Sequence, residues 1–321
     1  MSAPFTQRLG LGRLWYRFYH DGIARRYYWR RDFGKELAVP MTLGEWAMIA
    51  RAATLPKVAP TPGATAVLAC TFMTGHNFWH QTVFCASSLA RQWSGVFRPT
   101  FFDDGTLRSC EVAILRRIFP ESRVIRPDWV RARLDEMLPT RRFPILRGLR
   151  ERIPMVRKLV DLRATSQEWQ LYLDSDMLFF GHPAQLLDWN ARRIPFSMQD
   201  TVDGYCATPE RVNEVCERPV ARFVNAGVLA MDDSRIDWER IEYWCSRFTE
   251  AERRHILLEQ TISAALLSGG PREILPVEDY RVLYQPTEQP PEVALLHYVH
   301  LSKSMYFISE WRRYLATSLA T

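Results

Sequence analysis

The sequence predicts an α/β fold in which a mostly parallel sheet is sandwiched by helices, with a basic helical extension at the N-terminus. The chain has 321 residues, of which 47% are hydrophobic, so it can bury the core of one large domain. From residue 65 onward, short apolar runs alternate with helical patterns, which is typical of a parallel sheet covered on both faces. The third observation is an apolar run over residues 169–180 that two carboxylates, Asp174 and Asp176, interrupt.

Each element of this fold has its own pattern. The apolar run before Asp174 predicts a strand, and similar runs predict strands over 66–70, 96–102, 123–125 and 223–231. Helical periodicity predicts helices through 84–92 and over 107–118, 158–165, 238–253 and 257–267. The proline- and arginine-rich residues 139–157 are expected to be irregular or only partly helical. In such folds, ligands bind at the carboxyl ends of the strands, where Asp174 and Asp176 lie.

The N-terminal extension is basic and rich in aromatic residues. Residues 1–36 carry eight basic and three acidic side chains, and the aromatic residues of 11–28 have spacings close to those of one helical face. Two interpretations stay open, a helix in the interface of an anionic membrane and a helix packed on the main domain with its charges in water. Three prolines and a glycine in 56–63 indicate a linker. We therefore divide the chain into an extension, 1–60, and a domain, 61–321.

The cysteines and the apolar segments bear on the compartment. The six cysteines are scattered, form no Cys-x-x-Cys pair and mostly lie beside apolar residues, which favours free thiols and a reducing compartment. The N-terminus lacks a long apolar core, so we expect no secretory signal, and no stretch reaches the roughly 18 apolar residues that span a bilayer. The sequence predicts a cytoplasmic protein, with peripheral attachment to a membrane left open.

The acid pair carries the first chemical inference. Asp174 and Asp176 stand two residues apart at the end of an apolar strand, so both can reach one point. Carboxylates this close raise one another's pKa unless a cation lies between them. A divalent metal explains the pair best, and the matching donor is a sugar nucleotide whose diphosphate the metal bridges.

Four separated motifs extend this inference. They are Tyr-Leu-Asp-Ser-Asp-Met-Leu at 172–178, Lys158-Leu159 sixteen residues before Asp174, Phe-Val-Asn-Ala-Gly-Val-Leu at 223–229 with Glu259-Gln260 following, and His-Tyr-Val-His-Leu-Ser-Lys at 297–303. In this order they resemble the glycosyltransferases of the GT-A fold, closest to the retaining, nucleotide-sugar-using enzymes of glycosyltransferase family 8. The likeness covers residues 64–307 and implies a Rossmann-like, mostly parallel sheet.

The resemblance implies a metal and diphosphate site. Asp174, Asp176 and His297 would bind the metal, and Lys158 and Lys303 would contact the diphosphate. One imidazole, two carboxylates and phosphate oxygens suit Mn²⁺, with Mg²⁺ as the alternative.

The resemblance also implies contacts to the rest of the donor. Asn225 and Gly227 would hold the sugar, Gln260 would lie beside the anomeric carbon, and Asp200 would bond a sugar hydroxyl. Asn225, Asp200 and Gln260 are therefore the candidate catalytic residues. For the nucleotide, the candidates are Thr71, at the expected end of the first strand, and Asp103 and Asp104, before a glycine at the end of the second. An ordinary Asp-Gly turn is an equal interpretation of the last pair.

Three positions depart from the family's pattern. Glu259 replaces its aspartate, His300 replaces its usual glycine, and Ser304-Met305 replaces its Pro-Trp pair. Because His300 is also a histidine near the end of the chain, it is the alternative metal ligand to His297.

The predicted function is metal-dependent transfer of a sugar from a nucleoside-diphosphate sugar, by family usage a UDP-sugar, to a glycan or lipid-linked acceptor, with retention. Two other enzymes are considered, a haloacid-dehalogenase-type phosphatase, whose Asp-x-Asp normally lies near the start of the chain, and a sugar nucleotidyltransferase, which needs a glycine-rich phosphate loop. A non-enzymatic protein that binds nucleic acid or another anionic surface would explain the basic residues of 1–36 and 131–158. It leaves the four motifs unexplained, so we expect no nucleic-acid partner.

Overall fold

The computed structural model describes residues 25–166 and 168–317 of the chain and divides it into two compact units. The larger unit contains residues 55–282 and 291–297. The smaller unit contains, among the described residues, 25–54, 283–290 and 298–317. Most of the aromatic and basic segment expected to be helical over 11–28 lies outside the described residues.

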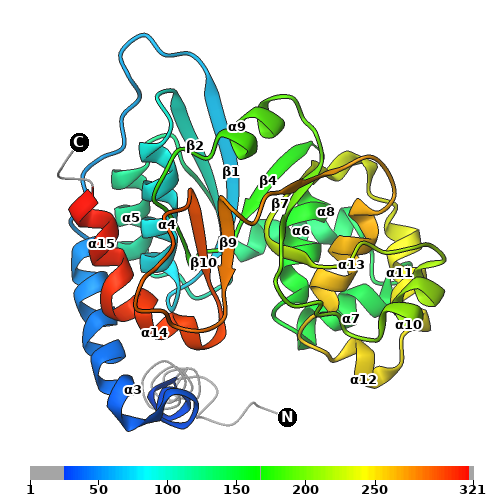
Figure 1. Cartoon of the computed structure of the whole chain (residues 1–321). Helices are drawn as coiled ribbons and strands as arrows, with labels where there is room; N and C mark the ends of the chain where they lie inside the picture. The colour runs from blue at the N-terminus through cyan, green and yellow to red at the C-terminus, as the bar shows by residue number, and fades with distance from the viewer. Residues whose placement is uncertain (1–24, 167, 318–321) are drawn as a thin grey trace, which may run out of the picture. The chain divides into compact units, whose positions relative to one another are not determined.

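A seven-stranded sheet forms the centre of the larger unit (Figure 1). Its strands are β1 (Val67–Thr74), β2 (Val96–Asp103), β3 (Arg123–Ile125), β4 (Trp169–Leu173), β6 (Phe196–Gln199), β7 (Val224–Asp232) and β8 (Glu273–Leu275), in the order β3-β2-β1-β4-β7-β6-β8. All neighbours pair in parallel except β7, which is antiparallel to both β4 and β6. The predicted α/β fold with a mostly parallel sheet is confirmed.

Helices connect these strands. They are α4 (Trp79–Arg91), α5 (Ser109–Ile118), α6 (Pro127–Met137), α7 (Pro144–Arg152), η2 (Lys158–Leu162), α8 (Arg163–Thr165), α9 (Ala184–Ala191), α10 (Pro209–Cys216), η3 (Asp233–Arg235), α11 (Trp238–Arg247), α12 (Glu250–Arg253) and α13 (Leu258–Leu267). The single helix expected over 238–253 is wrong. Phe248 has extended backbone angles, and Thr249 and Glu252 form a capping box that begins α12.

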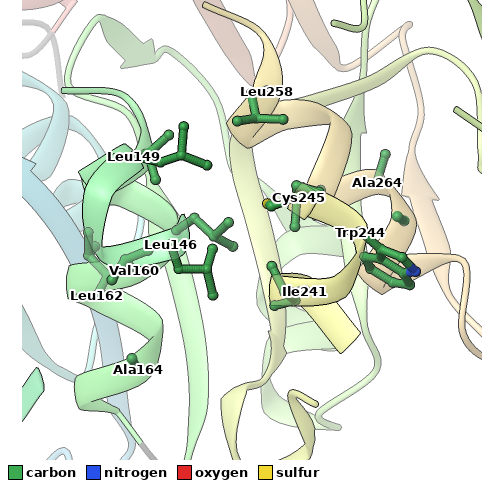
Figure 2. Packing of buried hydrophobic residues seen from close by; sticks show 14 of the residues in the cluster. Leu146, Leu149, Val160, Leu162, Ala164, Ile241, Trp244, Cys245, Leu258 and Ala264 are labelled. Atoms are coloured by element: carbon green, nitrogen blue, oxygen red, sulfur yellow. The ribbon is translucent and has the colours of Figure 1, made fainter. Parts of the chain in front are cut away.

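The hydrophobic core of the larger unit is visible in the packing of its helices (Figure 2). On α11, Ile241, Trp244 and Cys245 occupy positions i, i+3 and i+4 and are all buried, so they form one apolar stripe. On α7, Leu146 and Leu149 face inward. This helix occupies nine residues of the segment 139–157, which was expected to be irregular or only partly helical, and Pro144 at its first position favours a helix start there.

A second, three-stranded sheet has the order β5-β10-β9 and consists of β5 (Met177–Phe179), β9 (Tyr280–Leu283) and β10 (Leu295–Tyr298). Strand β5 begins directly after Asp176 and is antiparallel to β10, with Met177 opposite His297. This pairing brings residues more than 100 positions apart in the chain to one place.

The smaller unit is helical. It contains α3 (Arg25–Ala52), η4 (His300–Ser302), α14 (Lys303–Met305), η5 (Tyr306–Glu310) and α15 (Trp311–Thr317). Helix α3 is kinked at Gly34, which has a φ of 78°, and the ring centroids of Trp29 and Phe307 lie 5.0 Å apart. None of the described helices is both long and apolar enough to cross a membrane. All six cysteines are free.

Candidate functional site

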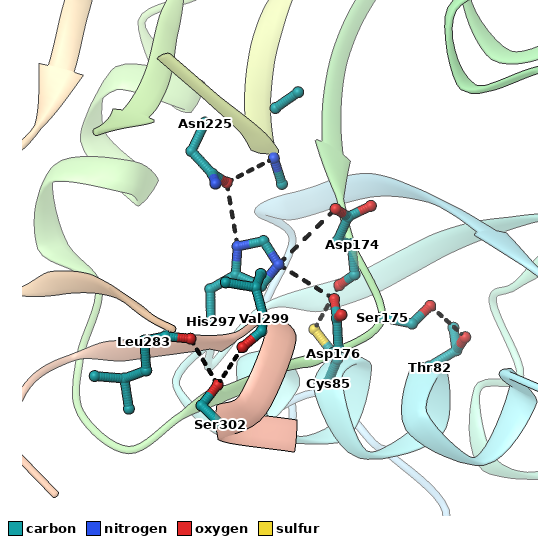
Figure 3. A network of polar contacts seen from close by, with 12 residues as sticks. Thr82, Cys85, Asp174, Ser175, Asp176, Asn225, Leu283, His297, Val299 and Ser302 are labelled. Atoms are coloured by element: carbon teal, nitrogen blue, oxygen red, sulfur yellow. Dashed lines mark hydrogen bonds and ion pairs between the residues drawn. The ribbon is translucent and has the colours of Figure 1, made fainter. Parts of the chain in front are cut away.

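The turn between β4 and β5 holds the two aspartates of the Asp-x-Asp motif (Figure 3). The backbone N–H of Asp174 donates to the carbonyl of Gly227 on β7, at 2.8 Å. Ser175, between the two acids, is buried, and its hydroxyl lies 2.7 Å from that of Thr82 on α4. Because Ser175 points into the protein, the flanking carboxylates can both lie on the opposite side of the turn.

His297 completes a group of three possible metal ligands (Figure 3). Its Nε2 lies 3.2 Å from a carboxylate oxygen of Asp176 and 3.9 Å from one of Asp174. One ligand atom from each residue falls within 4.8 Å of the others. The structure therefore brings together the three metal ligands that the resemblance implied.

Asn225 sets the orientation of the histidine. Its carboxamide oxygen lies 3.1 Å from Nδ1 of His297 and accepts the backbone N–H of Gly227 at 2.9 Å. An oxygen that must accept from Nδ1 favours the tautomer with the proton there, which leaves the lone pair of Nε2 toward the carboxylates. Such an outer partner is usual for a metal-binding histidine.

Gly227 allows this arrangement through its lack of a side chain. A Cβ at this position would lie 2.4 Å from Cε1 of His297, closer than van der Waals contact permits. The group that approaches this glycine most closely is thus the imidazole itself.

The three side chains fit a hard divalent cation. Two carboxylates supply oxygen and the imidazole supplies nitrogen, a set that suits Mn²⁺ and also Mg²⁺. The carboxylate side chains are 23% and 17% exposed for Asp174 and Asp176, so oxygen atoms of a ligand can reach them. These three side chains could thus act as ligands and leave access for others.

Lys158 supplies a positive charge to the same site. It lies in the π-helical turn η2 and is 9% exposed, and its Nζ is 2.6 Å from Asp174 and 5.0 Å from the ring centroid of Tyr172. Burial acts to lower the pKa of Lys158, but the carboxylates of Asp174 and Glu259 outweigh it and raise that pKa above its ordinary value. Lys158 is therefore protonated, and it faces the carboxylate of Asp174 as a buried cation.

Glu259 is buried near this lysine. Burial raises the pKa of Glu259, although the charge of Lys158 opposes the shift. Ser263, one turn along α13, donates to its carboxylate at 3.0 Å. Glu259 thus replaces the family's aspartate with an acid held inside the protein.

Asp200 and Gln260 extend the site on the other side of Asn225. The amide nitrogen of Asn225 donates to Asp200 at 2.8 Å, and the backbone N–H groups of Thr201 and Val202 donate to the other oxygen of that carboxylate. Gln260 accepts from the backbone N–H of Ala226, at 3.4 Å. A hydrogen-bonded chain therefore runs from His297 through Asn225 to Asp200.

A cavity of about 490 Å³ opens beside Asp200. Phe223 and Arg281 line it, and Phe223 has a φ of 56° although it is a bulky residue. Such a backbone angle is rare for an aromatic residue and is retained where surrounding contacts determine it. Here the carbonyl of Phe223 accepts from Asp200 at 2.7 Å. Arg281 was not among the residues predicted from the sequence, and no local motif indicates it.

The three candidate nucleotide residues all make contacts within the protein. The predicted end of the first strand at residue 70 is wrong, because β1 continues to Thr74; Thr71 lies within the strand and donates to Gln170 at 2.6 Å. Asp103 accepts from the backbone of Gly105 and Leu107 and pairs with an arginine at 2.9 Å. Asp104 accepts from Thr106 in an ordinary turn. Nucleotide binding by these three residues stays a prediction.

The remaining candidates belong to the smaller unit. Lys303 begins α14, and its role toward a diphosphate stays a prediction. His300, the alternative metal ligand, is not part of the group formed by Asp174, Asp176 and His297. Its φ of 51° lies in the left-handed region that favours glycine, which agrees with the glycine that the resembling family has at this position.

No family model matches the chain, and no curated protein matches it. Among solved structures, it is similar to the galactosyltransferase LgtC in complex with donor and acceptor sugar analogs, with a TM-score of 0.51 and 17% identity over 79% of this chain and 96% of that one.

A second similar structure is that of mouse xyloside xylosyltransferase 1, with a TM-score of 0.49 and 14% identity over 72% of this chain and 97% of that one. Because the identity to the galactosyltransferase is only 17%, that similarity establishes the fold and nothing more. The chain has the GT-A fold that nucleotide-sugar glycosyltransferases of family 8 also have.

Proposed function

We propose that this protein is a metal-dependent glycosyltransferase that moves a sugar from a nucleoside-diphosphate sugar to a glycan or lipid-linked acceptor. The observation that carries the proposal is the group of Asp174, Asp176 and His297, with ligand atoms within 4.8 Å of one another, in a GT-A fold. A phosphatase or a nucleic-acid-binding protein has no need of this combination.

The side chains near the group have distinct roles in this reaction. Asp174, Asp176 and His297 would hold Mn²⁺ or Mg²⁺, which when bound supplies Lewis-acid stabilisation of the leaving diphosphate. Lys158, 2.6 Å from Asp174, adds a positive charge against the phosphate oxygens. Lys303 is proposed as a second such cation on the strength of the resemblance.

Asn225, Asp200 and Gln260 are proposed to contact the sugar. Asn225 and Asp200 present hydrogen-bonding groups on the side of the site where the cavity beside Phe223 opens. Gln260, bonded to the backbone beside Asn225, is proposed to lie near the anomeric carbon. The cavity has room for an acceptor sugar, whose ring can stack on the aromatic face of Phe223.

The finer details of the reaction rest on the resemblance. Family 8 enzymes commonly use uridine nucleotides and retain the anomeric configuration, so we propose a UDP-sugar donor and a retaining mechanism. The similar galactosyltransferase was solved with donor and acceptor sugar analogs, which supports a two-substrate reaction.

The location of the protein is proposed as cytoplasmic with peripheral contact to an anionic membrane. Free cysteines suit a reducing compartment. On α3, Tyr27, Leu43 and Trp46 are exposed, and the guanidinium carbon of Arg26 lies 4.8 Å from the centroid of Trp46. Exposed aromatic side chains beside arginine suit the interface of an anionic bilayer.

The test is donor hydrolysis across a panel of UDP- and GDP-sugars, with and without Mn²⁺, together with calorimetric titration of Mn²⁺ and UDP. The wild type is compared with Asp176→Asn and with Asp188→Asn, a surface aspartate on α9 that pairs with Arg192 at the end of that helix. We expect metal-dependent release of one nucleoside diphosphate in the wild type and the Asp188 variant and none in the Asp176 variant. Absence of binding of both metal and nucleotide by the wild type would contradict the proposal.

A further inference from the structure

A second cavity, of about 480 Å³, lies in the larger unit apart from the candidate site. It is lined by Trp169, the first residue of β4, and by Asp232, the last residue of β7. These two residues face each other across the antiparallel pair. The metal-ligating turn follows the opposite end of β4, so none of the residues assigned to the donor lines this cavity.

The lining of this cavity carries an excess of positive charge. Four arginines (193, 218, 235 and 240) and two aspartates (232 and 237) contribute to it. The acids already have partners in the protein. Asp232 accepts from Ser234 and pairs with Arg235 at 3.2 Å, and Asp237 accepts the backbone N–H of Arg240 at the start of α11. Among the described residues, the guanidinium groups of Arg193, Arg218 and Arg240 have no carboxylate within ion-pair distance.

Two of these arginines are held against the same buried ring. The guanidinium carbons of Arg218 and Arg240 lie 5.3 and 5.9 Å from the ring centroid of Trp244, which packs on α11 in the core (Figure 2). Cation–π contact attracts each arginine to the ring. The two guanidinium carbons therefore lie at most about 11 Å apart, and an anion between or beside them would offset the repulsion between their charges.

The glycine at position 269 leaves room for the side chain of Arg218. A Cβ on Gly269 would lie 2.7 Å from its guanidinium nitrogen, so a larger residue would displace it. The preceding residue, Glu217, has a φ of 55°, and its carboxylate accepts from Tyr243 at 2.9 Å. Arg193, on the rim of the cavity, also has a positive φ, of 54°. Arg193 itself, and the residue before Arg218, therefore have left-handed backbone angles, which are uncommon for residues other than glycine.

We propose that this cavity is a binding site for a phosphate-bearing ligand, separate from the donor site. Guanidinium groups match the oxygens of a phosphate with two parallel hydrogen bonds each, and three of them suit more than one negative charge. Apolar side chains such as Met231 and Leu266 also line the cavity, so the phosphate is expected on a larger group, a sugar or a lipid.

The test measures binding by calorimetry and tryptophan fluorescence in the presence of EDTA, so that no metal assists binding at the donor site. The probes are inorganic pyrophosphate, glucose 6-phosphate and vesicles that contain phosphatidic acid. The proteins are the wild type, the double variant Arg218→Ala/Arg240→Ala, and Gly269→Ala, which displaces Arg218 without removing its charge. The matched control is Arg116→Ala/Arg123→Ala, which loses the same charge from exposed positions on α5 and β3. Asp176→Asn reports on the donor site, and thermal melting shows whether each variant is folded.

We expect pyrophosphate binding at least about tenfold weaker in the double variant and in Gly269→Ala, and within about twofold of wild type in the control and in Asp176→Asn. Binding of glucose 6-phosphate that follows the same pattern identifies a sugar phosphate as the ligand, and binding of the vesicles in that pattern identifies a lipid headgroup. Three outcomes overturn the proposal: no pyrophosphate binding by the wild type, an equal loss in the control, or a loss in Asp176→Asn with none in the cavity variants. If the double variant fails to fold, Arg193→Ala at the exposed rim takes its place.

Discussion

The carboxamide oxygen of Asn225 lies 3.1 Å from Nδ1 of His297, and the same side chain donates to Asp200 at 2.8 Å. One residue therefore links the proposed metal centre to the proposed sugar site. Because it orients an imidazole whose other nitrogen faces two carboxylates, its effect on metal binding can be separated from contact with the sugar.

Replacing Asn225 with alanine is expected to weaken Mn²⁺ binding by about 10- to 100-fold, the usual effect of losing an outer hydrogen bond to a ligating histidine. The measurement is calorimetric titration of Mn²⁺ without nucleotide, so loss of a sugar contact cannot contribute. Asn190→Ala is the control, since Asn190 accepts a hydrogen bond from Trp169 away from the site. Equal Mn²⁺ affinity in the Asn225 variant and the wild type would show that the hydrogen bond is irrelevant to the metal.

Gly227→Ala tests the close approach of strand β7 to the imidazole. The added Cβ would lie 2.4 Å from His297, so the ring must leave its present position beside Asn225 and Asp176. We expect a loss of about 1–3 kcal/mol in the free energy of unfolding and a clear loss of Mn²⁺ affinity. Gly270→Ala is the control, because a Cβ there would have no other atom within 4 Å, and it should leave Mn²⁺ affinity unchanged. Equal Mn²⁺ affinity in the two alanine variants would contradict the role given to Gly227.

Lys158→Met tests the buried cation beside Asp174. The variant keeps the length of the side chain and removes the charge that is proposed to face the phosphate oxygens. We expect UDP binding in the presence of Mn²⁺ to weaken by at least about tenfold, as measured by calorimetry. Lys57→Met, at an exposed position in the larger unit, is the matched control. Unchanged UDP affinity in the Lys158 variant would remove this lysine from the donor site.

The sequence indicated the three residues that the structure groups, Asp174, Asp176 and His297, but not the contacts that bring them together. Asp174 and Asp176 could be found because two acids in an apolar run need a cation, and His297 because its spacing to Lys303 resembles a family pattern. Their meeting depends on the pairing of β5 with β10, a contact between distant segments that no local pattern encodes. Arg281 could not be predicted for the same reason, since only the folded chain brings it to the cavity beside Asp200.

Element ends were predicted less well, for local physical reasons. The apolar character that predicted a strand over 66–70 continues through Phe72, and β1 extends to Thr74. The helix expected over 238–253 is interrupted because Thr249 and Glu252 cap a new helix, a pattern that the continuous periodicity obscured. His300 adopts a left-handed backbone, which its residue type does not indicate.

Asp233 provides a prediction about stability and pH. It is 3% exposed and accepts from Arg163 at 2.8 Å, while its second oxygen is buried without a hydrogen bond to any described residue. Burial raises the pKa of Asp233 to about 6 from an ordinary value of 3.8, and the charge of Arg163 only partly opposes the shift. Because the folded state holds this proton more tightly than the unfolded state, the contribution to stability is complete below about pH 4. It is lost as the pH rises through about 6.

The variant Asp233→Asn has no proton to lose at this position. Relative to wild type, its free energy of unfolding is therefore expected to increase between pH 4 and pH 7, by up to about 3 kcal/mol for a shift of this size. Urea unfolding of both proteins at several pH values measures the difference. Asn190→Ala, which removes no titratable group, should show a flat difference over the same range. A difference between Asp233→Asn and wild type that stays constant or decreases as the pH rises would mean that the Arg163 pair, rather than burial, governs this carboxylate.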